Sequence, residues 1–234
     1  FQFGSYSSIM ASPAVEKKSD KPFRVSIEGN IGAGKSTLIQ YFSRFPEVDV
    51  HVEPVAEWCN VRGHNLLDML YKDLNRHNYM FQHYVQLTRV KIQTHKTDKK
   101  VHIFERSLQN NRFCFIEMAH KAGQLLDPEY LILCQWYEWI EQNFDIDLDL
   151  IVYLRSSPEV VYERIKKRNR SEESTVSLDY LRQLHESYEK WLFHSNISIP
   201  VLQINVDNDI EEVEQLYVKH QGRILGHDGT SLRV

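Results

Sequence analysis

The 234-residue chain contains few cysteines, no long apolar run and no large excess of charge of either sign. Its three cysteines are odd in number and widely spaced, which excludes a CxxC metal motif and predicts free thiols in a reducing, intracellular compartment. No apolar segment approaches the ~20 residues that span a bilayer. The 28 basic and 32 acidic residues give a net charge of −4. We therefore expect neither a nucleic-acid polymer nor a membrane as partner.

The beginning of the chain differs in composition from the rest. Residues 1–21 are rich in Ser and small residues and lack hydrophobic periodicity, which predicts a disordered leader or a tag remnant. Acidic residues are missing before Glu16, as in a transit peptide, whereas the absence of Arg before Arg24 argues against one. Mitochondrial and cytoplasmic placements therefore both stay open. We expect one domain over residues 22–225 and a flexible tail over residues 226–234.

The most informative stretch is residues 24–37, RVSIEGNIGAGKST. It begins with an apolar alternation that is typical of a buried strand, continues as a G-x4-G-K-S loop, and leads into a segment with helical spacing. A strand, a glycine loop and a helix in this order are the context of a phosphate-binding loop, which a chance match in an ordinary turn lacks. The loop and the N-terminus of the helix present backbone N–H groups to phosphates. We predict that a nucleoside triphosphate is bound by Gly29, Asn30, Ile31, Gly32, Ala33, Gly34, Lys35, Ser36 and Thr37.

Within this loop, two side chains have their own predicted roles. Lys35 can bridge the β- and γ-phosphates, and the Ser36 hydroxyl can ligate Mg²⁺. The sequence therefore predicts a triphosphate site with a magnesium ion.

Five apolar segments alternate with helical patterns along the chain. This alternation predicts a parallel sheet with right-handed crossovers and helices on both faces, which is a three-layer α/β fold in one domain. The strands are expected around residues 25–27 and at 48–53, 101–105, 150–154 and 201–206. Helices are expected near 66–71 and at 75–96, 108–121, 128–144, from 158 onward, at 177–193 and at 210–220. The long, mostly polar helix at 75–96 suggests packing against another chain.

Polar residues end four of the predicted strands. Ligands of open α/β sheets gather at the carboxyl ends of the strands. Glu53 could there accept the proton of an attacking hydroxyl, while Glu105 and Arg106 could serve Mg²⁺ and the transferring phosphoryl group. Arg155 ends the fourth strand. For each residue alone, a solvated strand end is the simpler interpretation, and their joint placement favours a site.

A basic run, RIKKRNR at residues 164–170, has three interpretations. It could be a solvated helix face, or a nucleic-acid contact, which the acidic total disfavours. It could also be a lid that closes over the triphosphate and directs Arg164, Arg168 and Arg170 toward the charge of the transition state.

Aromatic and amide residues between the second and third strands, and shortly after the third, suggest a slot for a flat ring. Gln82 can form paired hydrogen bonds with the edge of a base, and aromatic faces can stack on it. Each aromatic residue taken singly could equally belong to the core. The residues considered are Trp58, Tyr71, Phe81, Gln82, Tyr84, Phe113 and Phe115.

Several segments together resemble the deoxynucleoside kinases, most closely the branch of the mitochondrial thymidine kinase and the insect multisubstrate kinase. In chain order they are GNIGAGKST, EPVAEW, NLLDMLYKD, FQHYVQLT, FERS, DLIVYLRSSPEVVYERIKKRNRSEES and LHESYEKWL. The resemblance covers about residues 22–225. It implies a P-loop kinase fold with an Arg-rich lid, transfer of the ATP γ-phosphate to the 5′-hydroxyl of a deoxyribonucleoside with Mg²⁺, and a homodimer.

The resemblance also implies roles for individual residues. Glu53 would be the general base, Arg106 would hold the 5′ oxygen and the transferring phosphate, and Glu105 would assist Mg²⁺. Tyr71 and Glu173 would bind the 3′-hydroxyl. The base would be held by Trp58, Phe81, Gln82 and Phe115, and the lid would be formed by Arg164, Arg168 and Arg170.

Two positions depart from the thymidine-preferring branch, which typically has Met and Ala where this chain has Arg89 and Asn111. The deoxycytidine and deoxyguanosine kinases are more similar there, with an Arg and an Asp. An arginine beside the base would narrow the pocket near a thymine methyl group and offer hydrogen-bond donors. We therefore expect activity on deoxycytidine or purine deoxynucleosides beyond thymidine, with a thymidine-preferring kinase as the alternative.

Three other functions remain as weaker alternatives. A regulatory GTPase would need an Asn-Lys-x-Asp segment and an Asp-x-x-Gly switch, and the sequence has neither. A nucleoside monophosphate kinase would need additional cations for the acceptor phosphate. A nucleotide-binding protein without catalysis would not depend on Glu53.

Overall fold

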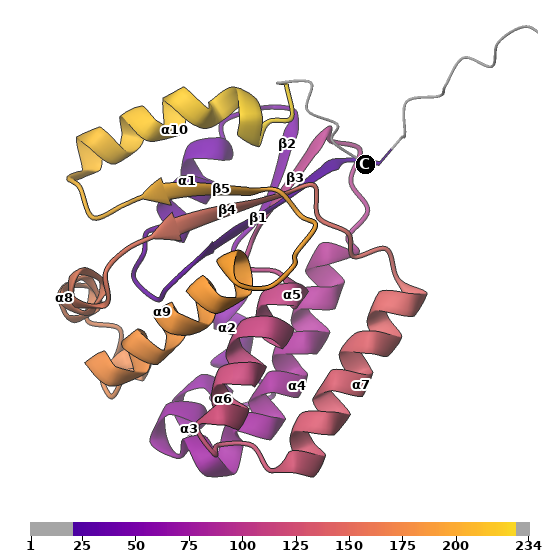
Figure 1. The fold of residues 1–234 in the computed structure, drawn as a ribbon, viewed down its shortest axis with the longest axis vertical. Coiled ribbons are helices and arrows are strands. Elements are labelled where there is room, and N and C mark those ends of the chain that lie inside the picture. The colour runs from indigo at the N-terminus through magenta and orange to yellow at the C-terminus, as the bar shows by residue number, and fades with distance from the viewer. Residues whose placement is uncertain (1–20, 228–234) are drawn as a thin grey trace, which may run out of the picture.

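The structure, a computed structural model, describes residues 21–227 and is built around a five-stranded parallel sheet (Figure 1). The strand order is β2-β3-β1-β4-β5. The strands are β1 (Phe23–Gly29), β2 (Val48–His51), β3 (Val101–Glu105), β4 (Leu150–Arg155) and β5 (Val201–Asn205). This sheet confirms the predicted α/β fold. The expected leader and tail lie outside the described residues, apart from Lys21, Gly226 and His227.

Helices connect the strands and follow the predicted order. They are α1 (Lys35–Phe42), α2 (Val55–Trp58), α3 (Leu66–Lys72), α4 (Leu74–Gln93), α5 (Leu108–Asn110), α6 (Glu117–Lys121), α7 (Asp127–Asn143), α8 (Pro158–Arg168), α9 (Leu178–Phe193) and α10 (Ile210–Ile224). A π-helical stretch, Asn111–Ile116, joins α5 to α6, and a 3₁₀ turn, Ser171–Glu173, precedes α9. Side chains of Asn65, Asp73 and Ser177 accept hydrogen bonds from the first turns of α3, α4 and α9. Such caps explain why these helices begin where they do.

The helices form a layer on each face of the sheet (Figure 1). Helices α1 and α10 cover one face, and α4, α5, α6 and α9 lie on the other, with α7 outermost beside α4. The β4 sequence LIVYLR is almost continuously apolar because helices cover both of its faces, and five of its six residues are buried. The main core therefore spans all three layers.

The parallel register brings the carboxyl ends of the strands to one edge. Ile27 of β1 pairs with Glu105 at the end of β3, so the loop after β1 begins next to this carboxylate. β2 ends at His51, two residues before the predicted Glu53. Glu53 therefore lies in the segment between β2 and α2, but it still follows the same edge of the sheet.

Candidate active site

The phosphate-loop sequence forms a tight turn between β1 and α1. Gly29, Gly32 and Gly34 have backbone φ angles of 147°, 81° and 89°, which residues with a Cβ atom rarely adopt. A Cβ on Gly29 would lie 2.7 Å from the carbonyl oxygen of Leu154, so the loop packs directly against β4. The turn leaves the N-terminus of α1 free to present its N–H groups to an anion.

Lys35, the first residue of α1, is buried at the base of this loop. Its Nζ donates to the Asn30 carbonyl oxygen at 2.8 Å and lies 3.8 Å from the Glu105 carboxylate. Burial, followed by the positive charge of Arg106, lowers the pKa of Lys35 to about 8. Lys35 is therefore mostly protonated and positively charged at neutral pH, and it loses its proton slightly above neutral pH.

Ser36 and Glu105 meet beside this lysine. The Ser36 hydroxyl donates to Glu105 Oε2 at 3.0 Å, and the backbone N–H of Glu53 donates to the same oxygen at 3.4 Å. A hydroxyl and a carboxylate are the hard oxygen ligands that Mg²⁺ accepts in combination with phosphate oxygens. This pair fits such an ion.

Glu53 lies between two buried arginines. Arg89 Nη2 donates to its Oε1 at 2.7 Å, and Arg106 Nη1 donates to its Oε2 at 2.6 Å. Burial opposes the ionisation of Glu53, but the charges of Arg106 and Arg89 outweigh it and hold the pKa of the carboxyl below its usual range. Glu53 is therefore a carboxylate, able to accept a proton, throughout the neutral range.

Arg106 is held in an uncommon backbone conformation with a φ of 58°. Its Nε donates to the Tyr188 hydroxyl at 3.1 Å, and its Nη2 donates to the Gly29 carbonyl oxygen at 3.2 Å. The next residue, Ser107, donates from both its backbone N–H and its hydroxyl to the buried carboxyl of Glu28. Burial raises the pKa of Glu28. This support could not be predicted from the sequence, because Glu28 lies inside an ordinary strand pattern.

A cavity of about 300 Å³ extends from the phosphate loop to a wall of aromatic and amide side chains. Trp58 and Phe81 meet edge to face there, with ring centroids 5.5 Å apart. The cavity brings together most of the predicted site residues. Those that line it are Ile31, Gly32, Lys35, Ser36, Glu53, Trp58, Tyr71, Phe81, Gln82, Arg89, Glu105, Arg106, Asn111, Phe115, Arg168, Arg170 and Glu173. Gly29, Asn30, Ala33, Gly34, Thr37 and Arg164 do not line it.

Three amide side chains of this wall and Gln124 behind it form a hydrogen-bonded row. Asn111 Nδ2 donates to Gln82 Oε1 at 2.7 Å, and Gln82 Nε2 donates to Asn78 Oδ1 at 2.9 Å. Asn78 Nδ2 then donates to Gln124 Oε1 at 3.2 Å. The Oδ1 atom of Asn111 is buried and has no hydrogen-bond partner. The row orients Gln82 and leaves one acceptor of Asn111 unused.

Sequence reasoning missed part of this wall. Asn78 lies one helical turn before Gln82 on α4, and that i, i+4 spacing was the available signal. Apolar residues and one tyrosine complete the lining without any motif of their own. They include Leu67, Leu70, Val85, Met118 and Tyr180.

The basic segment at the end of α8 lies partly over the cavity. Arg168 and Arg170 both donate to the carboxylate of Glu173, whose side chain is buried. Between them, Asn169 takes a left-handed φ of 53° and ends the helix. Arg164 instead donates to the Val206 carbonyl oxygen at 2.6 Å, away from the other two arginines.

Two sequence interpretations were wrong in position. Tyr84 does not line the cavity. Phe113 is 39% exposed and packs on Tyr137, because the π-helical stretch turns it to the outside. Arg155 ends β4 as predicted, pairs with Glu189 at 2.9 Å and does not line the cavity.

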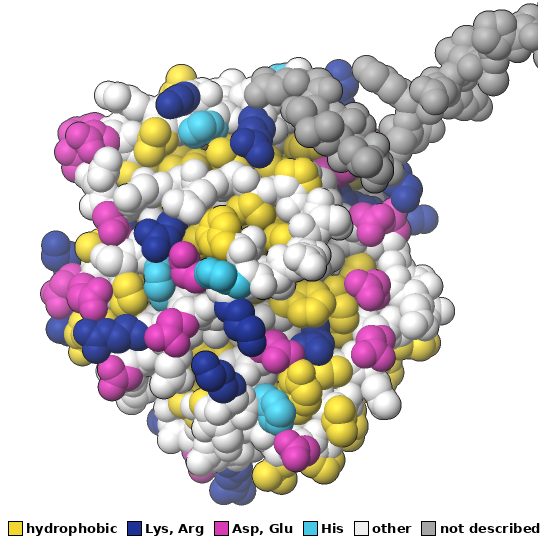
Figure 2. All heavy atoms as spheres, in the orientation of Figure 1, with side chains coloured by type: hydrophobic (Ala, Val, Ile, Leu, Met, Phe, Trp, Pro, Cys, Tyr) yellow, Lys and Arg dark blue, Asp and Glu magenta, His cyan; other side chains and the backbone are white. Residues whose placement is uncertain are grey.

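Figure 2 shows Lys and Arg side chains interspersed with Asp and Glu over the face drawn. Among residues 21–227, no helix combines the length and the apolar composition needed to cross a membrane.

The chain is similar to known proteins over most of its length. Residues 25–223 match the family model described as deoxynucleoside kinase. The chain is 39% identical over 216 residues to the human mitochondrial thymidine kinase 2, covering 91% of this chain and 82% of that protein. It is 42% identical over 191 residues to a probable deoxycytidine kinase of fowlpox virus, covering 80% of each. Identity to deoxycytidine kinase 2 of Gallus gallus is 35% over 230 residues, covering 83% of this chain and 87% of that protein.

Proposed function

The chain belongs to the deoxynucleoside kinase family, and we propose that its cavity is where the γ-phosphate of ATP passes to the 5′-hydroxyl of a deoxyribonucleoside in nucleotide salvage. One observation carries this proposal. The same cavity joins the phosphate-loop lysine to the aromatic and amide wall, with the carboxylate of Glu53 lining the space as well. A donor site, a proton acceptor and a slot for a base thus share one space.

The residues around Glu53 supply a mechanism for this transfer. The Glu53 carboxylate accepts the proton of the 5′-hydroxyl as the hydroxyl oxygen attacks the γ-phosphorus; the bond from this phosphorus to the β,γ-bridging oxygen breaks, and ADP leaves. The Arg106 guanidinium turns from Glu53 to the attacking oxygen and the transferring phosphoryl group, and it stabilises their negative charge. Lys35 holds the β- and γ-phosphates. Ser36 and Glu105 would hold Mg²⁺, which neutralises charge on the phosphates when it is bound.

We assign the basic segment at the end of α8, residues 164–170, to a lid. When a triphosphate enters, Arg168 and Arg170 can leave Glu173 for the phosphate oxygens, and Arg164 can join them from the same helix. Glu173 is then free to accept a hydrogen bond from the 3′-hydroxyl together with Tyr71. Exchange of partners would thus couple donor binding to acceptor binding.

We further propose that the base pocket favours deoxycytidine or purine deoxynucleosides over thymidine. The buried, unpartnered Oδ1 of Asn111 can accept a hydrogen bond from an exocyclic amino group, which cytosine and adenine have and thymine lacks. Arg89 adds bulk to this side of the cavity, although its guanidinium is bound to Glu53 and to the Ser107 carbonyl oxygen. The preference therefore depends more on Asn111 than the sequence alone suggested.

The base preference is tested with ATP and each of the four deoxynucleosides. Wild type, Arg89→Met, Asn111→Ala and the double variant are compared by kcat/KM. We expect wild type to use deoxycytidine or a purine better than thymidine, and Asn111→Ala to reverse this order. If thymidine leads in the wild type, the proposed preference is wrong while the kinase mechanism stands.

The proton acceptor is tested with Glu53→Gln. We expect kcat to fall by ~10²–10⁴, the usual effect of losing a general base. Glu57→Gln is the matched control, since Glu57 is an exposed carboxylate one helical turn away. Equal kcat of the Glu53 variant and the control would contradict the role of Glu53 as general base, whereas ATP binding without turnover in the wild type would favour a non-catalytic nucleotide-binding protein. Faster turnover of deoxynucleoside monophosphates than of nucleosides would instead favour a monophosphate kinase.

We propose a homodimer that forms through α7 and the adjoining face of α4. Apolar side chains on α7 are exposed by 41–57%, and yellow side chains follow this helix at the lower right of Figure 2. They are Leu131, Ile132, Trp136 and Trp139, and Met80 and Leu87 on α4 are exposed as well. A second copy could cover this face. Sedimentation velocity should show a dimer for wild type and a monomer for Trp136→Glu.

A further inference from the structure

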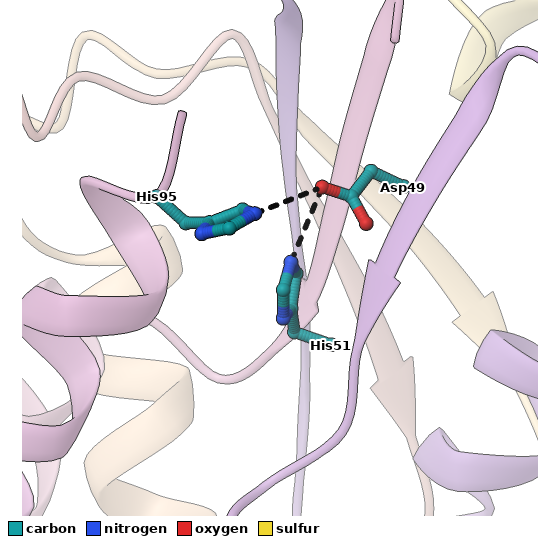
Figure 3. A group of neighbouring side chains, drawn as sticks. All are labelled: Asp49, His51 and His95. Carbon is teal, nitrogen blue, oxygen red and sulfur yellow. Dashed lines mark ion pairs between the residues drawn. The ribbon is translucent and has the colours of Figure 1, made fainter. Parts of the chain in front are cut away.

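A second group of polar side chains lies on the sheet away from the substrate cavity. Asp49 and His51 are alternate residues of β2, so both point to the same side of this edge strand. His95 follows the end of α4 and approaches the same carboxylate (Figure 3). One oxygen of Asp49 lies 3.3 Å from His51 Nε2 and 3.8 Å from His95 Nε2.

The spacing of these atoms suits one small cation. One ligand atom from each of Asp49, His51 and His95 lies within 4.8 Å of the other two. Ligands bound to Zn²⁺ at ~2.0–2.2 Å in a tetrahedron are about 3.4 Å apart. A closure of less than about 1.5 Å would therefore complete a three-ligand site, with a fourth position left for water.

One ring nitrogen of this cluster has no hydrogen-bond partner. His51 Nε2 is buried without a hydrogen-bond partner, although the Asp49 carboxylate is near. Next to it lies His102, fully buried, with neither ring nitrogen hydrogen bonded and its ring centroid 5.0 Å from that of His51. Buried polar atoms normally have a partner, and a cation placed between His51 Nε2 and the Asp49 carboxylate would supply one to this nitrogen.

The ligand types of the cluster also favour a cation. Asp49 supplies one carboxylate, and His51 and His95 supply two imidazoles. Carboxylate oxygens and imidazole nitrogens are ligands that zinc-class ions accept.

We propose that Asp49, His51 and His95 form a binding site for a divalent transition-metal ion of the zinc class. Imidazole nitrogens suit Zn²⁺, Co²⁺ or Ni²⁺ and not Mg²⁺, which requires oxygen ligands. The ion would fasten the edge strand β2 to the segment after α4. Because β2 ends two residues before Glu53 and α4 carries Arg89, the site joins the two elements that hold the catalytic carboxylate.

The test measures binding of Zn²⁺ alone to the full chain. The protein is prepared without a histidine tag, stripped with a chelator, and titrated against a chromophoric zinc indicator. We expect one ion per chain for wild type. His95→Asn and Asp49→Asn should weaken binding by at least about tenfold, because even second-shell changes cost 10–100-fold. Both positions are partly exposed, so these variants should fold.

A matched control and a competition separate this site from others. His227→Asn removes an exposed histidine and should leave the affinity unchanged. Excess Mg²⁺ should not displace the zinc, whereas it would displace zinc held by Ser36 and Glu105. Co²⁺ should give the visible spectrum of a low-coordinate nitrogen and oxygen site, without a thiolate band from Cys59.

Two outcomes overturn the proposal whatever the kinase assays show. One is wild type without saturable zinc binding. The other is binding that His95→Asn and Asp49→Asn leave intact or that Mg²⁺ abolishes. Thermal denaturation adds an independent measurement, since zinc should raise the Tm of wild type and not that of His95→Asn.

Discussion

The pKa of Lys35 leads to a quantitative prediction for ATP use at alkaline pH. Burial and Arg106 lower this pKa to about 8 in the free protein. Raising the pH from about 7 to about 9 reduces the protonated fraction of such a group about tenfold. Because only the charged lysine attracts the phosphates, kcat/KM for ATP should fall by about the same factor. Bound triphosphate raises the lysine pKa again, so kcat should fall much less over this range.

The assay uses initial rates with ATP varied and deoxycytidine saturating, since cytosine does not lose a proton in this range. Ionic strength and free Mg²⁺ are kept constant. Lys35→Arg provides the control, because a guanidinium remains charged throughout and should remove the alkaline decline, even at a lower absolute rate. A wild-type kcat/KM that is flat to about pH 9, or an equal decline in Lys35→Arg, would refute the assignment of this titration to Lys35.

Two further predictions concern stability and the lid. Gly29→Ala should lower stability by roughly 3 kcal/mol and the Tm by roughly 10 °C, because its Cβ would lie 2.7 Å from the Leu154 carbonyl oxygen and its φ is positive. Gly63→Ala, which has a positive φ but open space around it, should cost less in the same thermal scan. Glu173→Gln should lower kcat/KM for a deoxynucleoside about 10–100-fold through the lost charged hydrogen bond. The difference from wild type should vanish with a 3′-deoxy substrate, and its persistence would contradict the role of Glu173.

The elements and the phosphate site could be predicted because they depend on local patterns. The G-x4-G-K-S spacing predicts the turn before Lys35 wherever a strand precedes it and a helix follows. Parallel strands end at one edge, so Glu53 and Glu105 could be expected near each other before any coordinates were known. The family resemblance then supplied the roles that spacing alone leaves open.

The contacts between distant segments could not be predicted in this way. Arg89 was expected beside the base, yet its guanidinium binds Glu53, 36 residues earlier in the chain. Arg155 ends its strand at the predicted edge of the sheet, but its guanidinium forms an ion pair with Glu189 of α9. In both cases the choice of partner depends on how helices pack across the sheet, which the periodicity of a single segment does not contain. The π-helical stretch that turns Phe113 outward likewise has no sequence signature here.

The row of amides in the proposed base pocket has a consequence for redesign. Each amide has a donor end and an acceptor end, so the direction of one member dictates the direction of the next from Asn111 to Gln124. Gln124 lies outside the cavity lining, yet its oxygen accepts from Asn78 and so orients Asn78 and Gln82, which leaves Oδ1 of Asn111 without a partner. If Asn111 recognises the base as proposed, a substitution of Gln124 should change the base preference from a position outside the cavity lining.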